Sequence, residues 1–154
     1  MIRTPDRNIT ADLSAHAQIR PGAPAIVLGE RTISYAELDD AVWRTLSWLR
    51  DAGILPGMIV GLIMANQISL LLTMLGLMRL GATAFPLSPG APVLQNEELL
   101  REAQADVALS DPGVQTLPNF RILGFHEEYL RSARHDEPRL LGGTAAPCLL
   151  IPGS

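Results

Sequence analysis

The 154-residue chain contains no lysine, so all twelve of its basic residues are arginine. It can therefore supply neither the lysine of an ATP-binding P-loop nor a lysine that forms a Schiff base with a substrate. Its single cysteine, Cys148, excludes an intrachain disulfide and a cysteine-based metal cluster. This cysteine usage is typical of a reducing compartment, and we expect a cytoplasmic protein.

Clustered charge and long apolar runs are also absent. The net charge is −4 with no basic cluster, which argues against nucleic acid or an anionic membrane as the main partner. The most apolar stretch is interrupted by Asn66, Gln67 and Arg79, so no run reaches the ~20 residues of a membrane span. Residues 1–10 lack the apolar segment of a secretory signal. The length is that of one ordinary domain.

Residues 58–87 predict the centre of the fold. Met58–Met64 is a short apolar run, typical of a strand buried on both faces. Asn66 is a suitable N-cap and Gly81 a suitable terminator for the helix that follows. Thr83–Leu87 is a second short apolar run. Strand, helix and strand with tight connections form a βαβ unit, in which the two strands are parallel neighbours in one sheet.

The residues before this unit predict two helices and a hairpin. Ile9–Ile19 has apolar residues near helical spacing, and Ala25–Leu28 and Thr32–Tyr35 flank a Gly-Glu-Arg turn that indicates a small hairpin. Ser34 and Glu37 have the spacing of a capping box, so a second helix should begin there. The apolar stripe of that helix consists of Leu38, Val42, Leu46 and Leu49.

The residues after the βαβ unit continue the alternation of helix and strand. Ala91–Ala105 predicts a helix in which Glu97 stands four residues before Arg101, the spacing of a favourable ion pair. Asp106–Ser110 and Arg121–Phe125 predict short strands.

These elements together predict an α/β fold. We expect three layers, with a mostly parallel sheet flanked by helices and a small N-terminal hairpin. Residues 1–154 should form a single domain, and residues 126–145, which are charged and rich in proline and glycine, should form a surface loop or short helix. Pro147–Ile151 is a last apolar run.

Side chains that could perform catalysis are scarce. His16, His126 and His135 lack a histidine or cysteine partner at metal-ligand spacing, so we predict no metal ligands. The segment 126–128, His-Glu-Glu, is more typical of a solvated loop than of an acid–base pair. Ser154 lacks the glycine-flanked frame of a nucleophilic serine. We therefore assign no catalytic residue.

Four other conspicuous residues have a structural interpretation. Tyr35 and Glu37 stand at the start of a helix, which explains them without a role in substrate binding. Trp43 and Trp48 lie off the apolar stripe of that helix, and packing under a neighbouring element is favoured over stacking on a ligand.

The C-terminal residues give the one local hint of a ligand. An apolar strand that runs into Gly153 and Ser154 resembles the start of a glycine-rich loop whose backbone amides bind phosphate. The alternative is a frayed chain end without a ligand.

Five stretches, in order, resemble the adenylate-forming, AMP-binding enzymes, which include acyl-CoA synthetases, peptide-synthetase adenylation domains and luciferases. Ile33–Leu38 resembles the family's Thr-Tyr-x-Glu-Leu signature, and Leu55–Leu62 its Pro-Gly-Asp-x-Val segment. Leu77–Pro89 is similar to its Leu-Lys-Ala-Gly-Ala-x-Tyr-x-Pro-Leu-Asp-Pro motif. Asp106–Asp111 matches a strand of the same character. Pro147–Ser154 resembles the strand that leads into the family's Thr-Ser-Gly-Thr-Thr-Gly phosphate loop.

The chain departs from these motifs at four positions. Arg79 stands where lysine is usual, and Met58 and Ser88 each replace an aspartate. Gly153 stands where the phosphate loop usually has threonine. The first three positions lie in structural motifs, and only Gly153 lies in the phosphate loop itself.

The resemblance implies that the chain is the N-terminal part of the large domain of an acyl- or aryl-CoA synthetase, similar to the fatty-acid–CoA ligases of fatty-acid metabolism, or of a peptide-synthetase adenylation domain. Such an enzyme activates a carboxylic acid with ATP and Mg²⁺ as an acyl-adenylate, then transfers it to the thiol of coenzyme A or phosphopantetheine. Gly153 and Ser154 would begin the phosphate loop. The chain alone would be inactive and hold no cofactor.

The alternative is a non-catalytic α/β interaction or dimerisation module. In that module the chain would be complete. If the chain is instead an incomplete domain, the missing part should leave an exposed sheet edge or apolar helix face, through which we expect the chain to form a homodimer.

Overall fold

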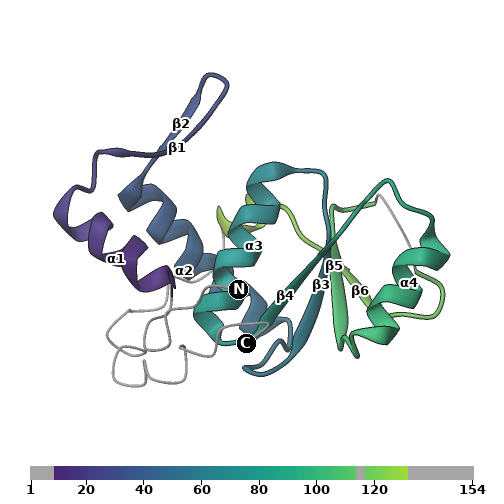
Figure 1. Cartoon of the computed structure of the whole chain (residues 1–154). Helices are drawn as coiled ribbons and strands as arrows, with labels where there is room; N and C mark the ends of the chain where they lie inside the picture. The colour runs from purple at the N-terminus through teal and green to yellow at the C-terminus, as the bar shows by residue number, and fades with distance from the viewer. Residues whose placement is uncertain (1–8, 114–116, 132–154) are drawn as a thin grey trace.

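The computed structural model describes residues 9–113 and 117–131, and within them it contains two sheets and the helices that cover them (Figure 1). The helices are α1 (Ile9–Ile19), α2 (Tyr35–Asp51), α3 (Gln67–Leu80), α4 (Val93–Glu102) and the 3₁₀ helix η1 (Glu127–Arg131). The strands are β1 (Pro24–Leu28), β2 (Arg31–Ser34), β3 (Ile59–Ile63), β4 (Thr83–Leu87), β5 (Val107–Ser110) and β6 (Ile122–Gly124).

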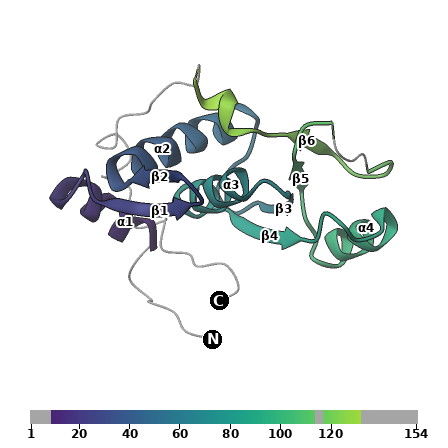
Figure 2. The ribbon, with the colours of Figure 1, turned by 90° about the horizontal axis from the view of Figure 1, so that it is seen from above.

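The main sheet is parallel throughout, in the order β4-β3-β5-β6, and the antiparallel pair β1-β2 forms a separate hairpin. Helices α2 and α3 lie on one face of the main sheet and α4 on the other, as both ribbon views show (Figures 1 and 2). The predicted three-layer α/β fold and its N-terminal hairpin are confirmed.

Both faces of the central strands are buried, as the apolar run of β3 predicts. Val60 and Leu62 belong to the core under α2 and α3, whereas Ile63 belongs to the core under α4. Between them, Gly61 leaves room for Leu100 of α4, because a Cβ at this position would collide with that side chain. Successive residues of a strand point to opposite faces, so this short strand serves two cores.

Helix α3 of the βαβ unit begins and ends where the sequence predicts. The side chain of Asn66 accepts a hydrogen bond from the Ser69 amide (2.9 Å), which satisfies one of the free amides at the start of α3. Gly81 has φ of +94°, the left-handed conformation that glycine adopts without strain. Strands β3 and β4 are parallel neighbours, from Ile59 opposite Thr83 to Ile63 opposite Leu87.

Helix α2 begins at the predicted capping box. The hydroxyl of Ser34 accepts from the Glu37 amide (3.1 Å), and the Glu37 carboxylate accepts from the Ser34 amide (2.9 Å). The predicted apolar stripe of α2 is buried throughout. Helix α3 approaches α2 closely at Gly76, where an added Cβ would lie 2.8 Å from Cγ2 of Thr45.

A buried arginine joins the first three helices. Arg79 of α3 is 6% exposed; its guanidinium lies 2.9 Å from the carboxylate of Asp39 and donates to the Thr10 carbonyl (3.0 Å) and the Ser14 hydroxyl (3.1 Å). Its other face lies over the ring of Trp43 (4.7 Å). The family resemblance puts lysine at this position. Here one guanidinium nitrogen, Nη2, makes all three polar contacts, and the planar guanidinium also stacks on an aromatic ring, an arrangement that arginine makes more readily than lysine.

The structure confirms a packing role for both tryptophans. Trp43 is buried beneath Arg79, and the ring of Trp48 contacts Phe125 edge-on (4.9 Å) and lies 6.3 Å from the ring of Tyr129. These aromatic contacts hold η1 and the end of β6 against α2.

The expected ion pair of α4 is wrong. Glu97 is only 2% exposed and accepts a hydrogen bond from the Asn119 amide (3.0 Å) instead of pairing with Arg101. The helix is also shorter than Ala91–Ala105, because Pro92 occupies its N-cap and Ala103 its C-cap. Glu97 faces the loop before β6, so spacing along the helix does not decide its partner.

Several sequence predictions lie outside the described residues. They concern His135, Cys148, the run Pro147–Ile151 and most of the expected loop 126–145, of which the structure describes η1 and the preceding His126. Of the helices in residues 9–113 and 117–131, none has both the length and the apolar character needed to cross a membrane.

Candidate functional site

The first candidate site lies between β3 and β5, where successive connections of the main sheet lead to opposite sides of β3. The connection from β3 through α3 leads to β4 on one side, and the connection through α4 then returns to β5 on the other side of β3. Such a switch point leaves a crevice outside the carboxyl ends of the two central strands, where α/β proteins commonly bind ligands.

Asp111 joins these two strand ends. Its Oδ2 accepts from the amide of Ala65 (2.7 Å) and, at longer range, from that of Asn66 (3.4 Å), so the residue after β5 fixes the loop after β3. Its Oδ1 and the hydroxyl of Ser69 are buried without a hydrogen-bond partner in the structure. Buried polar atoms of this kind usually have a hydrogen-bond partner, so each of the two marks a point where a water or a bound group could be accommodated.

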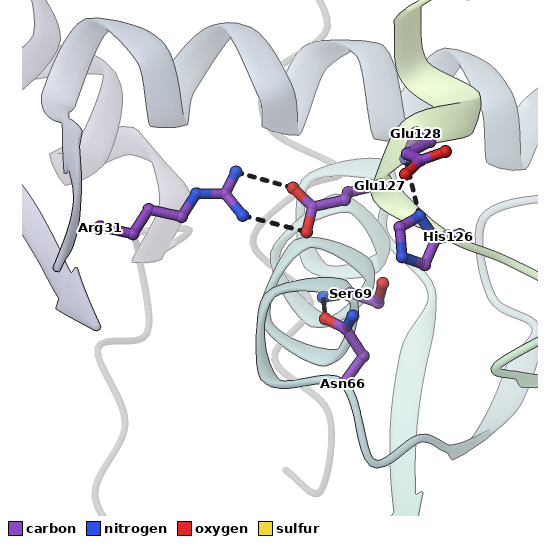
Figure 3. A network of polar contacts seen from close by, with 6 residues as sticks. All are labelled: Arg31, Asn66, Ser69, His126, Glu127 and Glu128. Carbon is purple, nitrogen blue, oxygen red and sulfur yellow. Dashed lines mark hydrogen bonds and ion pairs between the residues drawn. The ribbon is translucent and has the colours of Figure 1, made fainter. Parts of the chain in front are cut away.

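His126 follows β6 on the side of the sheet that carries α3 (Figure 3). Its Nδ1 accepts a hydrogen bond from the Glu128 amide (3.0 Å), which requires that nitrogen to be unprotonated. Glu127 points to the opposite side, toward Arg31 of the hairpin (Figure 3). The ring of His126 thus accepts from the backbone of Glu128, whereas the carboxylate of Glu127 pairs with Arg31, so neither contact joins the imidazole to a carboxylate. This arrangement does not favour an acid–base pair.

The second candidate site is an open hollow between α2, α3, β2 and η1, with a volume of about 470 Å³. Its lining combines an apolar floor with a rim of charged side chains. The residues that line it include Arg31, Glu37, Leu38, Asp40, Ala41, Arg44, Ile68, Leu72, Glu127, Leu130 and Arg131.

An ion pair between Arg31 and Glu127 crosses the rim of the hollow (Figure 3). The two nitrogen–oxygen distances are 2.7 and 3.1 Å, the geometry of a bidentate pair. The hydrogen bonds from Arg31 hold the pKa of Glu127 below its usual value, against an opposing effect of burial. The same bonds raise the pKa of Arg31. The pair thereby ties the hairpin to η1.

The structure describes some of the residues that the sequence singled out. Gly153 and Ser154 lie outside the described residues. Tyr35 and Glu37 stand at the start of α2 as expected, and no group of three potential metal ligands occurs within residues 9–113 and 117–131. Sequence reasoning missed Asp111 and the Arg31–Glu127 pair. The Asp-Pro-Gly turn after β5 could have indicated Asp111, whereas nothing local links two residues 96 positions apart.

The amino-acid sequence is similar to those of known proteins. Residues 13–139 match the family model described as AMP-binding enzyme. Tyrocidine synthase 3 of Brevibacillus parabrevis is 29% identical over 119 residues, which are 77% of this chain and 2% of that protein. The nonribosomal peptide synthetase sidE of Aspergillus fumigatus is 31% identical over 106 residues, which are 68% of this chain and 5% of that protein.

Solved structures of low sequence identity share the fold. An artificially fused adenylation–PCP di-domain, NpsA-ThdA from Klebsiella oxytoca, matches with a TM-score of 0.75 at 21% identity, over 87% of this chain and 25% of that one. The O-succinylbenzoate coenzyme A synthetase of Bacillus subtilis, in complex with AMP, matches with a TM-score of 0.71 at 18% identity, over 81% of this chain and 33% of that one. The chain thus spans a third or less of the length of each of these proteins.

Proposed function

The chain belongs to the AMP-binding enzyme family, and on that premise we propose that it is the N-terminal part of a larger adenylate-forming ligase. The family match over residues 13–139 carries this proposal. We propose that residues 1–154 form one partial domain whose role is to build the scaffold, with Gly153 and Ser154 at the start of the phosphate loop. A cytoplasmic location belongs to the same proposal.

The proposed reaction has two steps. A carboxylate oxygen attacks the α-phosphorus of ATP, which releases pyrophosphate and leaves an acyl-adenylate; a thiolate then attacks the acyl carbon and releases AMP. Mg²⁺ would screen the phosphate charges. The described residues contain no cluster of metal ligands, so no step of this chemistry is assigned to them.

The acid is proposed to be an amino acid or an aryl acid, and the thiol that of a phosphopantetheine carrier. The relative from Aspergillus fumigatus is a nonribosomal peptide synthetase. A structural neighbour, the N-terminal subdomain of NpsA from Klebsiella oxytoca, was solved with anthranilyl-AMSN. These likenesses favour this class over the fatty acid and coenzyme A that the sequence motifs also allow.

Two measurements test the proposal. Mass spectrometry of the natural gene product should give a mass far above the 16.6 kDa of this chain. The protein encoded by the natural gene should also exchange pyrophosphate into ATP when an amino or aryl acid is added. With a fatty acid the exchange should be much slower. Isolated residues 1–154 should show no saturable ATP binding at millimolar concentration; tight binding would mean that the nucleotide site is misplaced.

The alternative function, a non-catalytic module that dimerises, is favoured by exposed apolar side chains. Ile19 and Leu94 are 78% and 75% exposed, and β4 is an edge strand of the main sheet. If the protein encoded by the natural gene has a mass of 16.6 kDa and sediments as a dimer, this function is supported and the ligase proposal is overturned.

A further inference from the structure

We propose that the hollow between α2, α3, β2 and η1 binds a small organic anion with an apolar body. Its volume of about 470 Å³ falls within the ~300–1,000 Å³ typical of small-molecule sites. The inference does not depend on the ligase proposal, because none of the lining residues belongs to the stretch proposed to begin the phosphate loop.

The floor of the hollow supplies the apolar contacts. Side chains from three elements meet there, so the floor is a product of the tertiary fold and not of one amphipathic helix. They are Leu38 and Ala41 of α2, Ile68 and Leu72 of α3, and Leu130 of η1.

The carboxylates of the rim already have donors. Glu127 is held by the bidentate pair with Arg31, and Asp40 accepts from Nε of Arg44 (2.9 Å). The carboxylate of Glu37 accepts from the N-cap amide of its own helix (2.9 Å). These acidic groups therefore leave little capacity to bind a cationic ligand.

Within the part of the chain that the structure describes, one cation of the rim lacks such a partner. Arg131 makes no hydrogen bond or ion pair there, although its charge is near enough to help lower the pKa of Glu127. Three arginines and three acidic residues line the hollow, but among these described side chains only Arg131 retains a full set of donors. A carboxylate or sulfonate group above the apolar floor would satisfy that guanidinium.

The walls of the hollow are held in place before any ligand arrives. The Arg31–Glu127 pair joins the hairpin to η1, and the Leu130 carbonyl accepts from Arg44 of α2 (3.5 Å). The ring of Tyr129 also lies against Trp48 of α2. A preformed site spends little of its binding free energy on ordering the protein.

Titration followed by backbone-amide NMR shifts tests the inference, with octanoate as the probe and octylammonium as its cationic counterpart. For a ligand of this size we expect octanoate to bind with Kd of about 1 mM, with shifts in residues 31–41, 68–72 and 127–131. Octylammonium should bind at least about fivefold more weakly, because Arg131 repels its head group.

Two variants and a control separate charge from shape. Arg131→Gln should weaken octanoate binding about two- to fivefold, the range for a partly exposed ion pair, and should leave octylammonium unaffected or improved. Ala41→Phe should weaken both probes about tenfold or more by filling the hollow. Arg101→Gln, on the exposed surface of α4, should change neither.

Three results would overturn the inference. Equal affinity for the two probes would show that no anion is preferred. Shifts confined to other parts of the chain would place the ligand elsewhere. Contacts in the unliganded protein between the floor and residues 132–154, or a second copy of the chain, would show that the hollow is already filled by polypeptide.

Discussion

Replacing Asp39 by asparagine should destabilise the fold far more than the same replacement at Asp40, its neighbour in α2. Asp39 faces the interior and lies 2.9 Å from the guanidinium of Arg79, whose side chain is 5% exposed. Asp40 faces outward and pairs with Arg44, and the two side chains are 47% and 32% exposed. The two substitutions remove the same charge from the same helix and differ in the surroundings of the partner.

The burial of each ion pair sets the expected loss of stability. Removing one partner of a buried ion pair costs about 3–5 kcal/mol, because the other charge stays buried without compensation. Asparagine can still accept a hydrogen bond and the Asp39 side chain is 18% exposed, so we expect about 2–3 kcal/mol for Asp39→Asn. For the exposed pair of Asp40 we expect about 0–1 kcal/mol.

Urea denaturation followed by circular dichroism measures both values, and urea is preferred because guanidinium chloride would screen the ion pairs. The double variant Asp39→Asn with Arg79→Met should recover part of the loss, since no unpaired charge then stays buried. Equal effects of Asp39→Asn and Asp40→Asn, or a loss below about 1 kcal/mol at Asp39, would refute the reasoning that burial decides the value of this pair.

Three further predictions concern packing, pH and capping. Gly76→Val should cost about 1–3 kcal/mol in urea denaturation because it forces α2 and α3 apart, whereas Gly22→Ala, with no atom within 4 Å of the new Cβ, should change stability little. The pKa of Glu127 is lowered in the fold, so its pair with Arg31 should stabilise the protein above the ordinary pKa of 4.5 and lose that effect as pH falls through the lowered value. Arg31 is half exposed, so the difference in stability between wild type and Glu127→Gln should stay below about 1 kcal/mol; a larger difference, or one that grows toward low pH, would contradict this. Ser34→Ala should cost about 1 kcal/mol and fray the first turn of α2 in hydrogen exchange, and unchanged protection there would argue against the capping box.

The order and type of the elements were predictable because their signals are local. The capping box of Ser34 acts within one helical turn, and Asn66 and Gly81 act within the βαβ unit. An apolar run as short as β3 also predicts its own burial on both faces. Helix α4 was less predictable. It is shorter than expected, and the partner of its buried Glu97 belongs to a loop that comes later in the chain.

The candidate sites were much less predictable. The Arg31–Glu127 pair and the floor of the hollow join residues from the hairpin, two helices and η1, and the sequence holds no pattern that links them. Asp111 could be placed after a strand, but its bond to the Ala65 amide depends on β3 and β5 becoming neighbours. The hollow and the position of Arg131 on its rim were not foreseen.

By itself, then, the sequence determined the alternation of strands and helices, the helix ends and the family, because each of these depends on residues close together in the chain or on ordered motifs. Only the tertiary structure decided which charges are buried, which carboxylates are already occupied and where a hollow opens. Those properties depend on side chains from segments that are distant in the sequence. A side chain is buried, or an ion pair forms, only once folding has brought these segments together.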